Sequence, residues 1–185
     1  MIRQMTSPNE TNETPANALC KSCGLCCTGH LFIWTKLRSA ELDSAEALGL
    51  QVFRSVPRQR GFSQPCPLWQ GQCTVYSSPD YPHFCRTYKC KLLKKLMEET
   101  VSLSETLGTI QEAKAVIHEV EARLPASPQT NFRERLVEHL EDLEKKSAWD
   151  EADLAFRRKA DELLVLYERV FGVDDLVENP WKSLL

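Results

Sequence analysis

Cys20-Lys-Ser-Cys23-Gly-Leu-Cys26-Cys27 is the most informative segment of this sequence, because it holds four thiols within eight residues. Each C-x-x-C step lets two sulfurs turn toward a common point, and Gly24 supplies the backbone freedom that such a turn often needs. Three cysteines at successive three-residue steps can take three corners of an iron–sulfur cube, as in bacterial ferredoxins. Adjacent side chains cannot easily point at one site, so either Cys26 and Cys27 serve two sites or one of them is not a ligand.

A second group of thiols follows at wider intervals: Cys66, Cys73, Cys85 and Cys90. The intervals contain six, eleven and four residues, and none is a zinc-finger spacing. Cys66 is followed by Pro67, so it is a candidate for the Cys-Pro ligand that ferredoxins add from elsewhere in the chain. All eight cysteines together predict two four-ligand sites, or one site plus four other thiols. His30 and His83 lie close to the clusters, and either could replace a cysteine.

The composition limits the classes of protein that fit the chain. It has 185 residues and a net charge of −3, which gives no reason to expect nucleic acid as a partner. No apolar run approaches the roughly 18 residues of a membrane span. The first 18 residues lack the apolar core of a signal peptide, so we expect a cytoplasmic protein. Structural disulfides rarely persist there, and clustered thiols therefore indicate metal ligation.

Three regions are predicted along the chain. Residues 1–19 are rich in polar residues and are expected to form a disordered tail. Residues 20–90 form an irregular cysteine-rich metal-binding domain, in which residues 31–34 could be a strand and residues 39–48 a short helix, with Ser39 as its N-cap and Gly49 as its stop. Residues 91–185 are expected to be a helical appendage. The predicted fold class is therefore mostly α.

Apolar periodicity divides the appendage into about three helices. The first runs from residue 91 to Leu124 and is ended by Pro125 and Pro128. The second and third have apolar stripes that end at Leu143 and Phe171, and Gly172 is expected to stop the third helix. The stripe residues of these two helices are Phe132, Leu136, Leu140, Leu143, Leu154, Leu163, Leu164, Tyr167, Val170 and Phe171.

The order of these residues resembles the YkgJ-type cysteine-cluster family, which is described as a zinc- or iron-chelating domain. The similar region runs from Cys20 to Cys90. The matching residues are Cys20, Cys23, Cys26, Cys27, Cys66, Cys73, Tyr76, Pro82, Cys85, Arg86 and Cys90. Some proteins similar to this family are iron–sulfur proteins, and a flagellin lysine methylase has a similar cysteine cluster. The resemblance implies a metal site built from the eight thiols.

These observations leave three hypotheses for the function. The first is an iron–sulfur protein that transfers electrons or assists another enzyme, with Arg86 as a group that could donate hydrogen bonds to a sulfur. The second is a zinc-stabilised module whose helices bind a protein partner of unknown identity. The third is a metal-dependent enzyme that modifies a protein. The sequence has no nucleotide-binding or S-adenosylmethionine motif, and it leaves open whether the protein is an enzyme.

Overall fold

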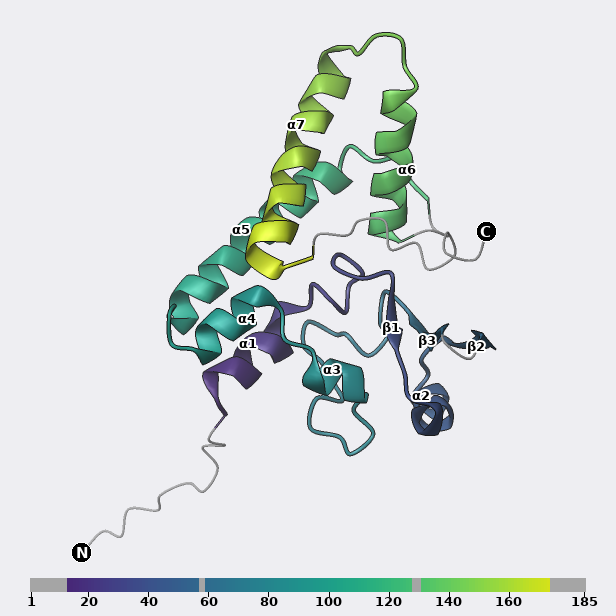
Figure 1. Cartoon of the computed structure of the whole chain (residues 1–185), viewed down its shortest axis with the longest axis vertical. Helices are drawn as coiled ribbons and strands as arrows, with labels where there is room; N and C mark the ends of the chain where they lie inside the picture. Colours follow the sequence, from purple (N-terminus) through teal and green to yellow (C-terminus); the bar gives the residue numbers. More distant parts are fainter. Residues whose placement is uncertain (1–12, 57–58, 128–130, 174–185) are drawn as a thin grey trace, which may run out of the picture.

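A computed structural model describes residues 13–56, 59–127 and 131–173, and it shows a mostly helical protein with one small sheet (Figure 1). Four helices lie on one side of the molecule: α1 (Pro15–Cys23), α4 (Lys91–Met97), α5 (Leu103–Glu121) and α7 (Glu151–Leu166). The sheet and α2 (Leu42–Ala47) lie on the other side. In Figure 1 α6 (Phe132–Glu144) is beside α7 (Glu151–Leu166). The prediction of a mostly α fold is therefore confirmed. In the part of the chain described here, no helix combines the length and apolarity needed to cross a membrane.

The prediction of a disordered tail over residues 1–19 was wrong at its C-terminal end, because helix α1 (Pro15–Cys23) begins five residues before Cys20. Thr14 caps this helix by accepting a hydrogen bond from the Asn17 backbone, and proline suits the first turn. Leu19 is buried, so the helix gains stability from packing as well as from its cap. The rest of the predicted tail, residues 1–12, lies outside the described residues.

The sheet has three short antiparallel strands in the order β1-β3-β2: β1 (Trp34–Lys36), β2 (Val52–Val56) and β3 (Gln59–Ser63). The single strand predicted at 31–34 is thus displaced to 34–36. Gly61 is required at the contact between β1 and β3, because a Cβ there would lie 2.2 Å from the Thr35 carbonyl oxygen. The predicted helix at 39–48 is present as the 3₁₀ turn η1 (Ser39–Glu41) and α2 (Leu42–Ala47). Its N-cap is Arg38 rather than Ser39, and Gly49 follows the helix with φ +85°.

The helical half differs from the prediction at one point, where the chain breaks between two helices. Helices α4 (Lys91–Met97) and α5 (Leu103–Glu121) replace the single helix expected up to Leu124. The chain turns at Glu99, whose φ is +55°, and a reciprocal pair of hydrogen bonds between Ser102 and Glu105 starts α5. The second predicted helix is α6. The third is α7, extended by the π-helical turn η2 (Tyr167–Phe171) and ended at Gly172 in the left-handed conformation.

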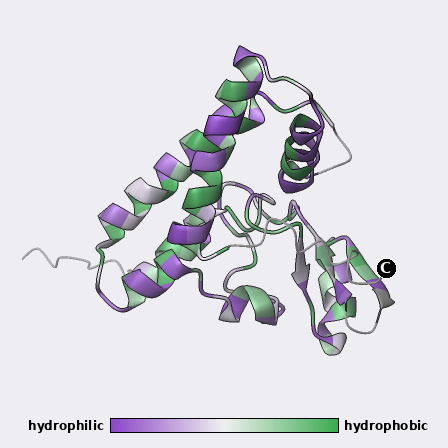
Figure 2. Cartoon of the chain, turned by 45° about the horizontal axis from the view of Figure 1, so that its top comes forward, coloured by the Kyte–Doolittle hydropathy of each residue, from purple (hydrophilic) through white to green (hydrophobic). Residues whose placement is uncertain are grey.

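The main hydrophobic core crosses the boundary predicted at residue 90. Leu25 and Leu31, from the loop after α1, pack in the same cluster as side chains from α4, α5, α6, α7 and η2. A smaller cluster of Leu37, Ala45, Leu50 and Phe62 lies under the sheet and α2. Figure 2 shows the green, apolar positions of α5 and α7 alternating with polar ones along each helix. The cysteine-rich region and the helices therefore share one core.

Candidate metal centre

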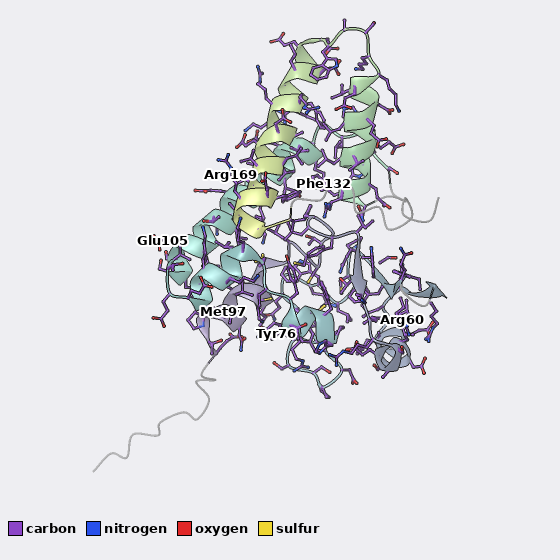
Figure 3. The ribbon with its side chains drawn as sticks, in the orientation of Figure 1. Arg60, Tyr76, Met97, Glu105, Phe132 and Arg169 are labelled. Atoms are coloured by element: carbon purple, nitrogen blue, oxygen red, sulfur yellow. The ribbon has the colours of Figure 1, made fainter. Side chains whose placement is uncertain are left out.

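All eight cysteines line one cavity of about 90 Å³. They come from α1 and the loop after it, the loop at 66–73, the short helix α3 (His83–Thr87) and the start of α4. Every one of these thiols is free and only partly exposed. The yellow sulfur atoms in Figure 3 lie between α1 and α3. The fold thus gathers thiols that are up to 70 residues apart in the sequence, from 20 to 90.

The first cluster is shaped by the end of α1. Cys20 and Cys23 are three residues apart on this helix, which puts both on the same face. Gly24 ends the helix with φ +78°, and a Cβ there would lie 2.2 Å from the ring of Trp69. A glycine is therefore needed both for the turn and for the indole that packs over it, and the turn leads the chain directly to Cys26.

Two backbone hydrogen bonds join the 66–73 loop to the first cluster. The Cys66 amide donates to the Cys27 carbonyl oxygen at 2.7 Å, and the Cys73 amide donates to the Lys21 carbonyl oxygen at 3.2 Å. Farther along the chain, the sulfur of Cys90 caps α4 by accepting a bond from the Leu93 amide at 3.4 Å. These bonds fix the backbone on which the sulfurs are held.

The electrostatic influences among the thiols fall into two overlapping groups. The pKa of Cys23 is raised first by burial and then by Cys90 and Cys20, and the pKa of Cys26 by burial and then chiefly by Cys23, Cys27 and Cys90. Cys27, in contrast, has its pKa raised by burial and then by three different thiols, which are Cys66, Cys85 and Cys73. We call Cys20, Cys23, Cys26 and Cys90 the first set, and Cys27, Cys66, Cys73 and Cys85 the second set.

This grouping bears on two points that the sequence left open. The two groups overlap, because Cys27 influences the pKa of Cys26, and Cys20 influences the pKa of Cys27 and of Cys85. The residue that joins the C-x-x-C-x-x-C run is Cys90, whereas Cys66, with its following proline, neighbours Cys73 and Cys27.

Burial keeps the thiols protonated while no metal holds them. It is the largest cause of the raised pKa of every cysteine in the cavity, and it brings Cys23 to about 11 and Cys85 to about 12. Lysines oppose this effect: Lys89 lowers the pKa of Cys20, and Lys114 lowers the pKa of Cys23. Any metal ion that bound here would have to displace protons, and the nearby ammonium groups would offset the charge of the thiolates that formed.

Aromatic rings shield the cavity from water. Phe84 stacks on Tyr88 with ring centres 5.4 Å apart, and Phe32 meets Tyr88 edge-on at 5.1 Å. The buried amide of Gln64 also lines the cavity, and its nitrogen donates to the Thr35 hydroxyl at 2.8 Å while its oxygen has no hydrogen-bond partner. Sequence reasoning missed Gln64, because a lone glutamine carries no motif signal.

The other predicted site residues point elsewhere. The Arg86 guanidinium donates to the backbone oxygens of Ser78 (3.2 Å) and Tyr81 (3.5 Å), so it braces the loop before α3 instead of bonding to a sulfur. His30 contacts the Thr28 hydroxyl and the ring of Phe132, and it does not line the cavity. His83 is likewise outside the cavity lining.

The donor chemistry fits a thiophilic metal. Eight sulfur donors, apolar walls and nearby lysines suit zinc or an iron–sulfur cluster, both of which bind cysteine thiolates. Among the described residues, no three His, Cys, Asp or Glu side chains yet converge closely enough to hold an ion. The sulfurs would have to draw together around a metal.

No family model, curated protein or solved structure matches the chain.

Proposed function

We propose that this protein is a two-centre thiolate metalloprotein, in which each set of four cysteines holds one iron–sulfur cluster for electron transfer or for support of another enzyme. The observation that carries the proposal is the single cavity lined by all eight free thiols. Three thiols of a C-x-x-C-x-x-C run with a distant fourth form a common ligand pattern for such clusters. Here the fourth would be Cys90.

When bound, the clusters would supply one-electron redox chemistry. The chain's own contribution would be to hold the thiolates, to exclude water with Phe84 and Tyr88, and to offset negative charge with Lys89 and Lys114. Adjacent Cys26 and Cys27 belong to different sets, so the two centres would be neighbours joined through one peptide bond. Such proximity would suit the passage of an electron from one centre to the other.

Zinc is the alternative metal. Four thiolates per ion make a closed tetrahedral site, which is typical of structural zinc. The shared core favours this reading, because a metal that fixes the loop at Leu25 and Leu31 also stabilises the helices packed on it. In that case the function would lie in a protein partner of the helices. A metal-dependent enzyme requires an open coordination position, and four thiolates on each metal would leave none.

The test is purification of the full chain without oxygen, followed by measurement of iron, sulfide, zinc and visible absorption. Brown protein with matching iron and sulfide would support the proposal, whereas colourless protein with about two zinc ions per chain would support the alternative. Protein with neither metal would contradict both.

Two substitutions test the division into two sets. Cys90→Ser and Cys85→Ser each remove one ligand from a different set, so each is expected to lose about half of the metal while the paired variant loses nearly all of it. Thr87→Ala, at an exposed position of α3 two residues after Cys85, is the matched control and should keep the full metal content. If Cys90→Ser and Cys85→Ser each abolished all metal binding, the two-set division would be wrong.

A further inference from the structure

One buried amide in the wall of the thiol cavity is only partly hydrogen-bonded. Gln64, which follows β3, is 7% exposed and lines the cavity together with Thr35 of β1. Its Nε2 donates to the Thr35 hydroxyl at 2.8 Å, whereas its buried Oε1 has no hydrogen-bond partner among the residues that the structure describes. A buried polar atom without a partner costs free energy, and it points to a group that meets it when the site is filled.

The backbone and the sheet hold this amide inside the molecule. The Gln64 N–H donates to the Ile33 carbonyl oxygen at 3.0 Å, which ties the residue after β3 to the residue before β1. Thr35, the partner of the amide, is itself only 3% exposed. The second partner of the Gln64 amide must therefore come from the cavity and not from bulk water.

The cavity offers mainly sulfur as that partner. Besides the eight thiols and the Gln64–Thr35 pair, the polar side chains of the lining are those of Tyr81 and Tyr88. The Tyr81 hydroxyl already donates to the Cys85 carbonyl oxygen at 3.3 Å. Eight sulfurs against one remaining hydroxyl make sulfur the polar group that this lining most readily presents to an amide.

The chemistry of a metal-bound sulfur decides which end of the amide faces it. A thiolate held by a metal has no hydrogen to donate, so only the nitrogen end of an amide can bond to it. A half-turn about the last side-chain bond of Gln64 exchanges oxygen and nitrogen with almost no change of shape. The Thr35 hydroxyl, which can donate as well as accept, would then donate to Oε1 and leave the N–H groups for the sulfur.

From this pair of Gln64 and Thr35 in the wall of the thiol cavity, we propose that the Gln64 amide donates a hydrogen bond to a metal-bound thiolate. Thr35 is the positioning residue that holds the amide. The recipient belongs to the second set, because Cys66 lies two residues after Gln64 and lines the same cavity. The bond stabilises negative charge on the sulfur. This proposal rests on the proposed function as a thiolate metalloprotein, and it holds for an iron–sulfur cluster and for zinc alike.

The test is anaerobic titration of the reduced, metal-free, full-length chain with Co²⁺, whose sulfur-to-metal charge-transfer absorption reports on its thiolate ligands. Gln64→Met replaces the amide with an apolar side chain of similar length. Its Kd for Co²⁺ should weaken by about tenfold, since a hydrogen bond to a charged group contributes on that scale. Its charge-transfer band should move to lower energy, because the lone pairs of the sulfur lose the stabilisation.

The outcomes separate this proposal from the proposed function. Wild-type protein that bound Co²⁺ through its thiolates, with the same Kd and band position in Gln64→Met, would overturn the role of Gln64 and leave the metal function standing. Wild-type protein that bound no Co²⁺ would contradict both.

A double variant separates metal binding from folding. Thr35→Val combined with Gln64→Met removes both partners of the buried bond, which is expected to be nearly neutral or stabilising in the metal-free chain. Its urea midpoint without metal should therefore not fall, while its Kd for Co²⁺ should weaken as in Gln64→Met. If the Kd weakened only as far as the metal-free stability fell, the amide would have a purely structural role and the proposal would be refuted.

Thr106→Val is the matched control. Thr106 on α5 is 1% exposed and its hydroxyl donates to the Leu103 carbonyl oxygen at 2.8 Å, but it is not among the residues that line the cavity. Because it is remote from the thiols, the variant should change the Kd for Co²⁺ by less than about twofold and leave the band in place. A change as large as that of the double variant would show that loss of any buried hydroxyl has this effect, and it would overturn the proposal.

Discussion

Gly24 offers the sharpest test of how the first cysteine cluster is built. In the Gly24→Ala variant the new methyl would lie 2.2 Å from Cζ2 of Trp69, and the backbone would have to hold φ +78° with a side chain present. The left-handed conformation costs about 1–2 kcal/mol for alanine. Relief of the overlap with Trp69 adds about 1–3 kcal/mol. The variant should therefore lose about 2–5 kcal/mol of unfolding free energy.

Gly49→Ala is the control that separates the two contributions. Gly49 has φ +85°, but a Cβ there would meet nothing within 4 Å, so only the backbone cost of about 1–2 kcal/mol applies. Urea unfolding of both variants, followed by circular dichroism, measures the difference, and replacing Trp69 with alanine in the Gly24→Ala background should recover the overlap contribution. If Gly24→Ala were no more destabilising than Gly49→Ala, the reasoning about the Trp69 contact would be refuted.

Two further outcomes are expected. Burial raises the pKa of Cys23 to about 11 and of Cys85 to about 12, from an ordinary 9.0, so the folded metal-free chain binds these protons more tightly than the unfolded chain. Its stability should be full below about pH 9 and decline as the pH rises toward these values; a urea midpoint that rose with pH would contradict this. Leu163→Ala, at a fully buried position of α7, should cost about 2–5 kcal/mol, whereas Leu154→Ala, at a position 47% exposed on the same helix, should cost less than about 0.5 kcal/mol in the same assay. Equal costs would show that the face assigned to the core is wrong.

The sequence predicted the helices best where packing alone decides them. Leu136, Leu143 and Leu163 belong to the predicted stripes and are fully buried. Met97 and Leu107 are apolar residues within the first predicted helix, yet they are 54% and 38% exposed, because the chain breaks between α4 and α5 and the periodicity does not continue across the break. The left-handed turn at Glu99 has no glycine to signal it.

Short elements were harder to predict, because a brief helix or strand signal can conflict with the overall composition of the segment that contains it. The Thr14-Pro15 start of α1 is a recognisable helix signal, but the polar residues before it favoured a tail. The strands β2 and β3 pair with an irregular register between Phe53 and Val56, which weakens any alternation. Strand pairing here is set by tertiary contacts more than by pattern.

The grouping of thiols could not be read from spacing. Intervals along the chain show which sulfurs are close in sequence, so the C-x-x-C-x-x-C run was visible. Only the folded chain places Cys90, 64 positions beyond Cys26, beside that run, and it does so because the short α4 packs on α1.

Leu25 and Leu31 share one hydrophobic core with the long helices, so residue 90 is not a domain boundary at which the chain could be divided. A ligand that binds the folded thiols therefore raises the free energy needed to unravel helices that never touch it. In a thermal melting experiment, the circular dichroism signal of the helices would then report whether a ligand is bound at the cysteines. A fragment that ended at Cys90 would expose the leucine face of that loop to water, and it would be expected to aggregate instead of behaving as an isolated module.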